Sequence, residues 1–176
     1  MDRFLEEIVV KKSKGINEVL YFLSAVVMVL AALMGFMQLN MIFYSFSVPA
    51  LIMVVLNLGI AVLLFLFRDR LRTEYEYTFT NGDMDFAQVF NNKKRKALGG
   101  LKMNRIDAFG KVDSAAFQRY ISMPGIQKTN WFLNRGADLY YFYFQKENNK
   151  RVIIIEPSEE MVRYIKMYLP RGAWQE

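Results

Sequence analysis

Cysteine and histidine are both absent from this chain of 176 residues. Their absence excludes disulfides, thiolate nucleophiles and imidazole acid–base chemistry, and it removes the side chains that hold most zinc, haem and iron–sulfur centres. Glycine-rich phosphate-binding motifs are also absent. We therefore expect no catalytic residues, no metal and no cofactor.

Charge is missing from a long internal segment. Residues 19–67 contain no charged side chain, whereas one membrane-spanning helix needs only about 20 apolar residues. The segment therefore predicts a transmembrane helical hairpin, residues 18–67, with spans at about 18–39 and 48–67. Pro49 falls in the first turn of the second span, where its missing N–H is tolerated.

Two other interpretations of the uncharged segment are less consistent with its length. The buried core of a soluble protein would leave too few residues to cover two wholly apolar helices. A cleavable signal peptide has an apolar region of only about 7–15 residues followed by a small-residue cleavage site. The uncharged segment is far longer than such a region, and no small-residue cleavage site ends it.

The charged residues around the hairpin predict its orientation. Basic residues flank it on both sides, Lys11, Lys12 and Lys14 before it and Arg68, Arg70 and Arg72 after it, and its loop has none. The positive-inside rule then places the N- and C-termini in the cytoplasm. We expect a two-span protein of the cytoplasmic membrane.

The N-terminal residues, 1–17, have the pattern of an amphipathic helix. Acidic residues come first, lysines follow, and Gly15 is positioned to end the helix. Four apolar residues share one face at helical spacing: Phe4, Leu5, Ile8 and Val9. This helix would lie either in the headgroup region or against the cytosolic domain.

The segment after the hairpin, residues 73–176, is long enough for one compact cytosolic domain. Residues 73–80 alternate apolar and polar side chains, which predicts a half-buried strand. Asn81-Gly82 is a strong signal for a tight hairpin turn, and residues 83–90 form the returning strand.

The remaining pattern adds a basic turn, more strands and two helices. The turn is predicted at 91–96 and the next strand at about 97–104. A short helix at 113–121 has Asp113 as its N-cap, and Ser158 caps a C-terminal helix that ends near residue 168. Three further strands are predicted at 129–133, 138–145 and 151–156. Strands followed by a C-terminal helix indicate an α+β domain with an antiparallel sheet.

The order of these segments resembles the bacterial PH-like membrane proteins. More narrowly, it is similar to a two-helix membrane family of Gram-positive anaerobes for which no activity is established. The resemblance rests on the EYEY strand from Glu74, Thr80-Asn81-Gly82, Asp83, Asp85, the basic run Lys93–Lys96 and the segment Glu156–Arg171. It implies a PH-like fold, a bent antiparallel sheet with a C-terminal helix, and it implies no activity. A mid-domain helix and about six strands depart from the seven strands of a PH domain.

Basic residues near the membrane form the candidate binding site. The chain has 23 Lys+Arg against 17 Asp+Glu, a formal charge of +6. The strand pair leaves the membrane and returns, so the basic turn is expected near the anionic leaflet, where each cation contributes about 1 kcal/mol. The predicted headgroup-binding residues are Lys93, Lys94, Arg95, Lys96, Arg68, Arg70 and Arg72. A merely solvated turn is the alternative interpretation.

Together these features predict a non-enzymatic integral membrane protein. Its PH-like domain would present a binding or scaffold surface to an unknown protein partner at the inner membrane surface. An envelope protein that engages anionic lipid through residues 93–96 is the alternative, and a membrane-bound enzyme would need a polar cleft that the sequence does not indicate. Nucleic acid is not an expected partner, because aromatic residues do not interleave the basic run.

Small residues in the first span leave the oligomeric state open. Ala31 and Gly35 are four residues apart, a spacing that permits close helix packing, and Asn57 is a polar residue within the second span. These residues would serve either a homo-oligomer or the packing of the hairpin itself.

Overall fold

The computed structural model describes residues 3–13, 15–147 and 149–175. It divides into two compact units. The β unit consists of Met1–Lys12, Glu74–Val89 and Lys94–Glu176, and the hairpin unit consists of Ser13–Thr73 and Phe90–Lys93. The β unit therefore includes the N-terminal segment in addition to most of the predicted domain at 73–176.

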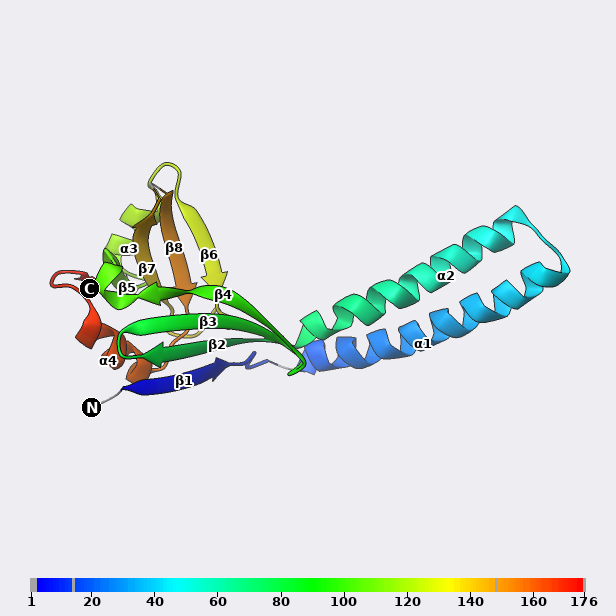
Figure 1. Ribbon diagram of the computed structural model, residues 1–176, viewed down its shortest axis with the longest axis horizontal. Coiled ribbons are helices and arrows are strands. Elements are labelled where there is room, and N and C mark those ends of the chain that lie inside the picture. Colours follow the sequence, from blue (N-terminus) through cyan, green and yellow to red (C-terminus); the bar gives the residue numbers. More distant parts are fainter. Residues whose placement is uncertain (1–2, 14, 148, 176) are drawn as a thin grey trace. The chain divides into compact units, whose positions relative to one another are not determined.

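The hairpin unit contains two long helices, α1 (Gly15–Tyr44) and α2 (Val48–Phe67), drawn in blue and cyan to green in Figure 1. Helix α2 begins where the sequence predicts, because Ser47 caps it and accepts a hydrogen bond from the N–H of Ala50 at 3.3 Å. Helix α1 extends beyond the predicted span at both ends. Both helices are long and apolar enough to cross a membrane.

Small residues let the two helices approach closely. Ala31 and Gly35 of α1 are buried, and a Cβ atom added to Gly35 would lie 2.8 Å from Cδ2 of Leu58. Asn57 of α2 donates a hydrogen bond from Nδ2 to Oε1 of Gln38 at 3.0 Å. The small and polar residues of the spans therefore act within the hairpin.

The β unit begins with a strand. The four-stranded sheet has the order β1-β2-β3-β4, and β1 (Phe4–Val9) pairs antiparallel with β2 (Thr73–Thr80). The predicted N-terminal helix is therefore wrong over these residues, and residues 1–2 and 14 lie outside the described chain. Pairing with β2 gives the backbone its hydrogen bonds and buries Val9, which outweighs helix-end charges worth about 0.3–1 kcal/mol each.

The turn after β2 forms as predicted. Asn81 and Gly82 both have positive φ angles, 50° and 94°, and β3 (Asp83–Phe90) returns along β2. The following turn is shorter than expected, because β4 (Lys94–Lys102) begins three residues before the predicted start at residue 97. Half of the predicted basic turn, residues 94–96, is therefore strand.

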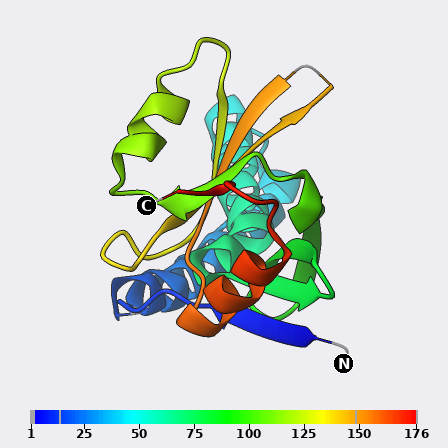
Figure 2. The same ribbon diagram turned by 90° about the vertical axis from the view of Figure 1, so that its left-hand side faces the viewer.

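The second sheet has five strands in the order β6-β8-β7-β5-β9. These strands are β5 (Ala108–Lys111), β6 (Gln127–Trp131), β7 (Tyr140–Lys146), β8 (Asn149–Ile155) and β9 (Trp174–Gln175). Two pairs, β6 with β8 and β5 with β9, are parallel, so the sheet is mixed. Figure 2 shows the red C-terminal strand beside β5.

Strand β7 is buried on both faces, because each face is covered by other elements. Its residues Tyr140, Phe142 and Phe144 join a core that includes side chains of the four-stranded sheet and of α4 (Glu159–Tyr168). Tyr141 and Tyr143 instead pack with Phe117 of α3 (Ala115–Ile121).

The N-cap residue was predicted correctly for α4 and wrongly for α3. Ser158 caps α4 as predicted, whereas Ser114 caps α3 in place of Asp113. In both helices the serine hydroxyl accepts a hydrogen bond from a backbone N–H three residues later.

Candidate functional site

The predicted arginines lie in a short 3-10 helix, η1 (Arg68–Arg72), that continues the chain after α2. The guanidinium carbon of Arg70 lies 4.6 Å from the ring centroid of Phe67, and that of Arg68 lies 5.1 Å from the ring centroid of Tyr21. These distances are within the range of cation–π contacts. Two arginines just after α2 therefore pack against aromatic rings of the hairpin unit.

Arg72 has several partners within the hairpin unit. It forms an ion pair with Glu18 of α1, its guanidinium carbon lies 3.8 Å from the ring centroid of Tyr21, and Nη1 donates to Oδ1 of Asn91 at 3.2 Å. The Nε atom of Arg72 is buried and has no hydrogen-bond partner among the described residues.

Asn91 connects the turn after β3 to the base of the hairpin. Its backbone N–H donates to the carbonyl oxygen of Arg72 at 2.8 Å. Its Nδ2 donates to Oδ1 of Asp69 at 2.8 Å and to the hydroxyl of Tyr21 at 3.1 Å. The φ angle of Asn91 is 49°, a conformation that asparagine tolerates better than most residues. We call Glu18, Tyr21, Asp69, Arg72 and Asn91 the hairpin-base cluster.

The predicted basic residues divide between the two units. Lys93 belongs to the hairpin unit with the three arginines and is exposed. The next three, Lys94, Arg95 and Lys96, are exposed on β4 of the β unit. Arg95 Nη2 lies 2.7 Å from Oε2 of Glu76 on β2, so its charge is paired within the sheet.

Apart from Arg72, the residues of the hairpin-base cluster were not predicted from the sequence. Glu18 and Tyr21 are three residues apart on α1, a spacing that places them on one helix face, and this was an available signal. The sequence contains no local signal for Asn91 and Asp69, because their contacts depend on how the chain returns after β3.

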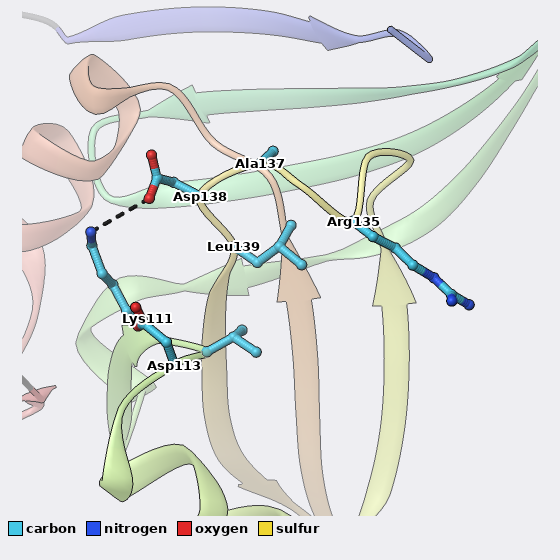
Figure 3. A pocket seen from close by; sticks show the side chains of 7 residues that line it. Lys111, Asp113, Arg135, Ala137, Asp138 and Leu139 are labelled. Carbon is cyan, nitrogen blue, oxygen red and sulfur yellow. Dashed lines mark hydrogen bonds and ion pairs between the residues drawn. The ribbon is translucent and has the colours of Figure 1, made fainter. Parts of the chain in front are cut away.

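The β unit has two open pockets that share Ala137 and Asp138. The smaller, about 230 Å³, is drawn in Figure 3. Lys111 Nζ lies 3.5 Å from Oδ1 of Asp138, while Arg135 points away from this pair. Interactions with Tyr140 and then Asp138 raise the pKa of Lys111.

The larger pocket is an open groove of about 550 Å³ along β1. We call it the β1 groove. It is lined on one side by Glu7, Ile8, Val9, Val10 and Lys12, and on the other by Ala137, Asp138 and the segment Glu156, Pro157, Ser158 and Glu159. The backbone beside it is fixed, because Asn134 accepts from the N–H of Lys12 at 2.8 Å and donates to the carbonyl oxygen of Val10 at 3.0 Å.

Charged side chains of both signs line the two pockets. Over residues 3–13, 15–147 and 149–175, no group of three Asp or Glu side chains is placed to hold a metal ion. The β1 groove offers charged side chains, apolar side chains and an edge strand, which are features of a recognition surface.

The β unit has two packed sheets and a C-terminal helix, which is the architecture of a PH-like α+β domain. An apolar helical hairpin with two candidate membrane spans is inserted in the sequence between β1 and β2. A protein-family model described as Bacterial PH-like domain (DUF6106) matches residues 1–175, and the chain belongs to that family. No curated protein and no solved structure matches the chain in these comparisons.

Proposed function

We propose that this chain is a non-enzymatic integral membrane protein whose hairpin spans the cytoplasmic membrane and whose β unit is a binding or scaffold module at the inner surface. One observation carries the membrane assignment. Large apolar side chains are exposed around both helices, including Ile16, Phe36 and Phe65 at 72, 62 and 67%. Soluble monomers rarely expose apolar patches beyond a few hundred Å², whereas hydrocarbon chains cover such a surface at no cost.

The orientation is tested by cysteine accessibility, because the natural chain has no cysteine. Ser45→Cys lies in the exposed loop between α1 and α2, and Ser13→Cys precedes α1. In intact cells, a membrane-impermeant maleimide should label Ser45→Cys only, and Ser13→Cys should react after permeabilisation. Labelling of Ser13→Cys in intact cells refutes the orientation, and release of the protein from membranes by alkaline carbonate refutes the membrane assignment.

The binding role of the β unit is supported by the β1 groove. The groove combines an edge strand with the exposed side chain of Ile8, at 57%, and edge strands accept extended segments of partner proteins. We therefore favour a protein or peptide partner for this groove.

The partner is tested by co-purification from native membranes, with mass spectrometry of both proteins and lipids. The wild-type chain is compared with Ile8→Arg, which changes the groove, and with Gln118→Arg on the exposed side of α3. A partner that Ile8→Arg loses and Gln118→Arg retains supports the groove. A set of co-purified proteins that neither variant changes contradicts it.

Engagement of anionic lipid is the second candidate. Arg70 is exposed beside Phe67 at the end of α2, and cations near an anionic leaflet contribute about 1 kcal/mol each. Arg72 is already paired with Glu18, although a lipid oxygen would satisfy its unpaired Nε. Lys93 adds an exposed cation to the same unit.

Hydrogen exchange in nanodiscs tests this candidate with the full chain. Amides of residues 90–96 should be better protected in phosphatidylglycerol than in phosphatidylcholine nanodiscs, and the difference should fade with salt as screening shortens from about 8 Å at 0.15 M to about 3 Å at 1 M. Replacing Lys93, Lys94, Arg95 and Lys96 by glutamine should abolish the difference. Equal exchange of the wild-type chain in both lipids contradicts lipid engagement.

A further inference from the structure

A basic pocket lies in the β unit where the chain leaves the four-stranded sheet. Strand β4 ends at Lys102 and passes through the short 3-10 helix η2 (Met103–Arg105) toward β5, opposite the end of β7. Met103 and Ile106 are buried, and the N–H of Met103 donates to the carbonyl oxygen of Gly82 at 2.8 Å. These contacts fix the corner and leave a pocket of about 270 Å³.

The charges around this pocket have one sign. Lys102, Arg105 and Lys146 line it from three different elements, and no acidic residue does. Lys102 Nζ lies 3.8 Å from Oδ2 of Asp83, but both side chains are more than half exposed, so this pair is weak. Arg105 and Lys146 are exposed. Within the described residues they form no ion pair.

Arg151 provides an independent observation beside the pocket. It lies directly opposite Phe144, which lines the pocket, in the antiparallel pairing of β7 with β8. Directly paired residues project to the same face of a sheet. The Nε of Arg151 is buried and lacks a hydrogen-bond partner among the described residues. Arg151 does not itself line the pocket, but its positive charge adds to that of the three cations that do.

We propose that this basic pocket binds a small phosphate-bearing anion. Three cationic side chains from separate elements, with the charge of Arg151 nearby, suit the several oxygens of a phosphate better than the two of a carboxylate. Leu101, Ile106 and Phe144 supply an apolar wall for the group that carries the phosphate. The volume lies just below the roughly 300–1,000 Å³ of sites for drug-sized ligands, which favours a phosphate ester smaller than a nucleotide.

This assignment rests on the proposed binding role of the β unit and adds, at a separate pocket, a second ligand of a different chemical class from the protein or peptide partner of the β1 groove. The phosphate has two chemical sources, a free small ester or a lipid headgroup. Both present the same oxygens to Lys102, Arg105 and Lys146, so the experiment supplies each source separately.

The test uses the full chain in nanodiscs with isotope-labelled isoleucine and leucine methyl groups, followed by NMR. In one arm, glycerol 3-phosphate is titrated into phosphatidylcholine nanodiscs. In the other, phosphatidic acid replaces part of the phosphatidylcholine, with no soluble ester. Saturable shifts of the Ile106 and Leu101 methyl signals are expected in at least one arm. Shifts in the first arm identify a free ester, and shifts in the second identify a headgroup.

Two double variants distinguish binding at this pocket from nonspecific attraction of the anion to the protein's positive charge. Arg105→Gln with Lys146→Gln should weaken binding at least about tenfold, because one lost hydrogen bond to a charged group already has that effect. Lys102 is kept so that Asp83 retains its partner. The matched control is Arg163→Gln with Arg171→Gln, two exposed cations outside the pocket, which should change binding less than twofold.

Three results overturn the assignment. They are the absence of shifts in both arms, equal shifts with potassium chloride at the same ionic strength, and unchanged affinity in the Arg105→Gln, Lys146→Gln variant. None of them affects the cysteine-labelling and co-purification tests, so failure of the basic pocket and failure of the proposed function are distinguishable.

Discussion

Tyr77 connects the two sheets of the β unit through one hydroxyl group. Its side chain is fully buried on β2. The hydroxyl donates to the carbonyl oxygen of Trp131 at the end of β6 and accepts from the N–H of Glu156, just after β8, at 3.2 Å. Removing this hydroxyl leaves a carbonyl and an N–H without their partner.

The substitution Tyr77→Phe should lower the free energy of unfolding by about 1–3 kcal/mol. This range is the usual cost of leaving buried polar groups unsatisfied. The ring itself is retained, so its packing against Phe86, at a centroid distance of 5.5 Å, is unchanged. The predicted loss therefore comes from hydrogen bonding and includes no cavity.

Urea titration of the full chain in detergent micelles measures this loss. The chain has two tryptophans, Trp131 and Trp174, and both belong to the β unit, so their fluorescence reports this unit alone. Tyr75→Phe on the same strand is the matched control. The hydroxyl of Tyr75 lies 3.5 Å from the carbonyl oxygen of Asn130, at the limit of a hydrogen bond, and its loss should cost within about 0.5 kcal/mol.

The pH dependence provides a second measurement of the same group. Burial raises the pKa of Tyr77 above its usual range and raises the pKa of Tyr141 to about 12. Since the unfolded value is about 10, the folded state favours the neutral phenols. Their contribution is complete below pH 10 and is lost as the pH rises above it. Tyr77→Phe should make this alkaline loss shallower, with Tyr141 still contributing. An unchanged urea midpoint together with an unchanged alkaline slope would refute the reasoning.

Three further substitutions test other contacts. Gly35→Leu should separate the two helices, because its added Cβ would lie 2.8 Å from Leu58 Cδ2; faster amide exchange along α1 measures this, and unchanged exchange contradicts it. Gly110→Ala places a Cβ 2.6 Å from the backbone oxygen of Gln175 and should detach β9, seen as a change in tryptophan fluorescence of the folded chain. Ser158→Ala removes the N-cap of α4 and should lower the urea-unfolding free energy by about 0.5–2 kcal/mol; a change within error would show that the cap is dispensable.

Elements with local signals were predicted well. The turn at Asn81-Gly82 requires positive φ angles that glycine and asparagine tolerate, and both flanking strands have the expected bounds. The second helix begins at its predicted residue because Ser47 and Pro49 act within one turn. Such signals involve residues only a few positions apart and hold in many tertiary contexts.

Strand β1 and the early start of β4 needed partners distant in sequence. The segment Phe4–Val9 suits a helix or a strand, and its pairing partner lies beyond the whole hairpin. Basic residues from Lys94 onward suggested a turn, yet an exposed edge strand tolerates them, and Arg95 pairs with Glu76 on β2. Strands β5 and β9 are too short to show a period of alternation.

The sequence by itself determined that two apolar helices precede a strand-rich domain with a C-terminal helix, because composition and local periodicity specify these features. The tertiary structure decided which charges are paired and which are available. It joins Arg72 to Glu18 and Asn91, pairs Arg95 with Glu76, and gathers Lys102, Arg105 and Lys146 around one pocket. Charges exert their effects over a few ångströms of space, and distances between residues far apart in sequence are set only when the chain folds.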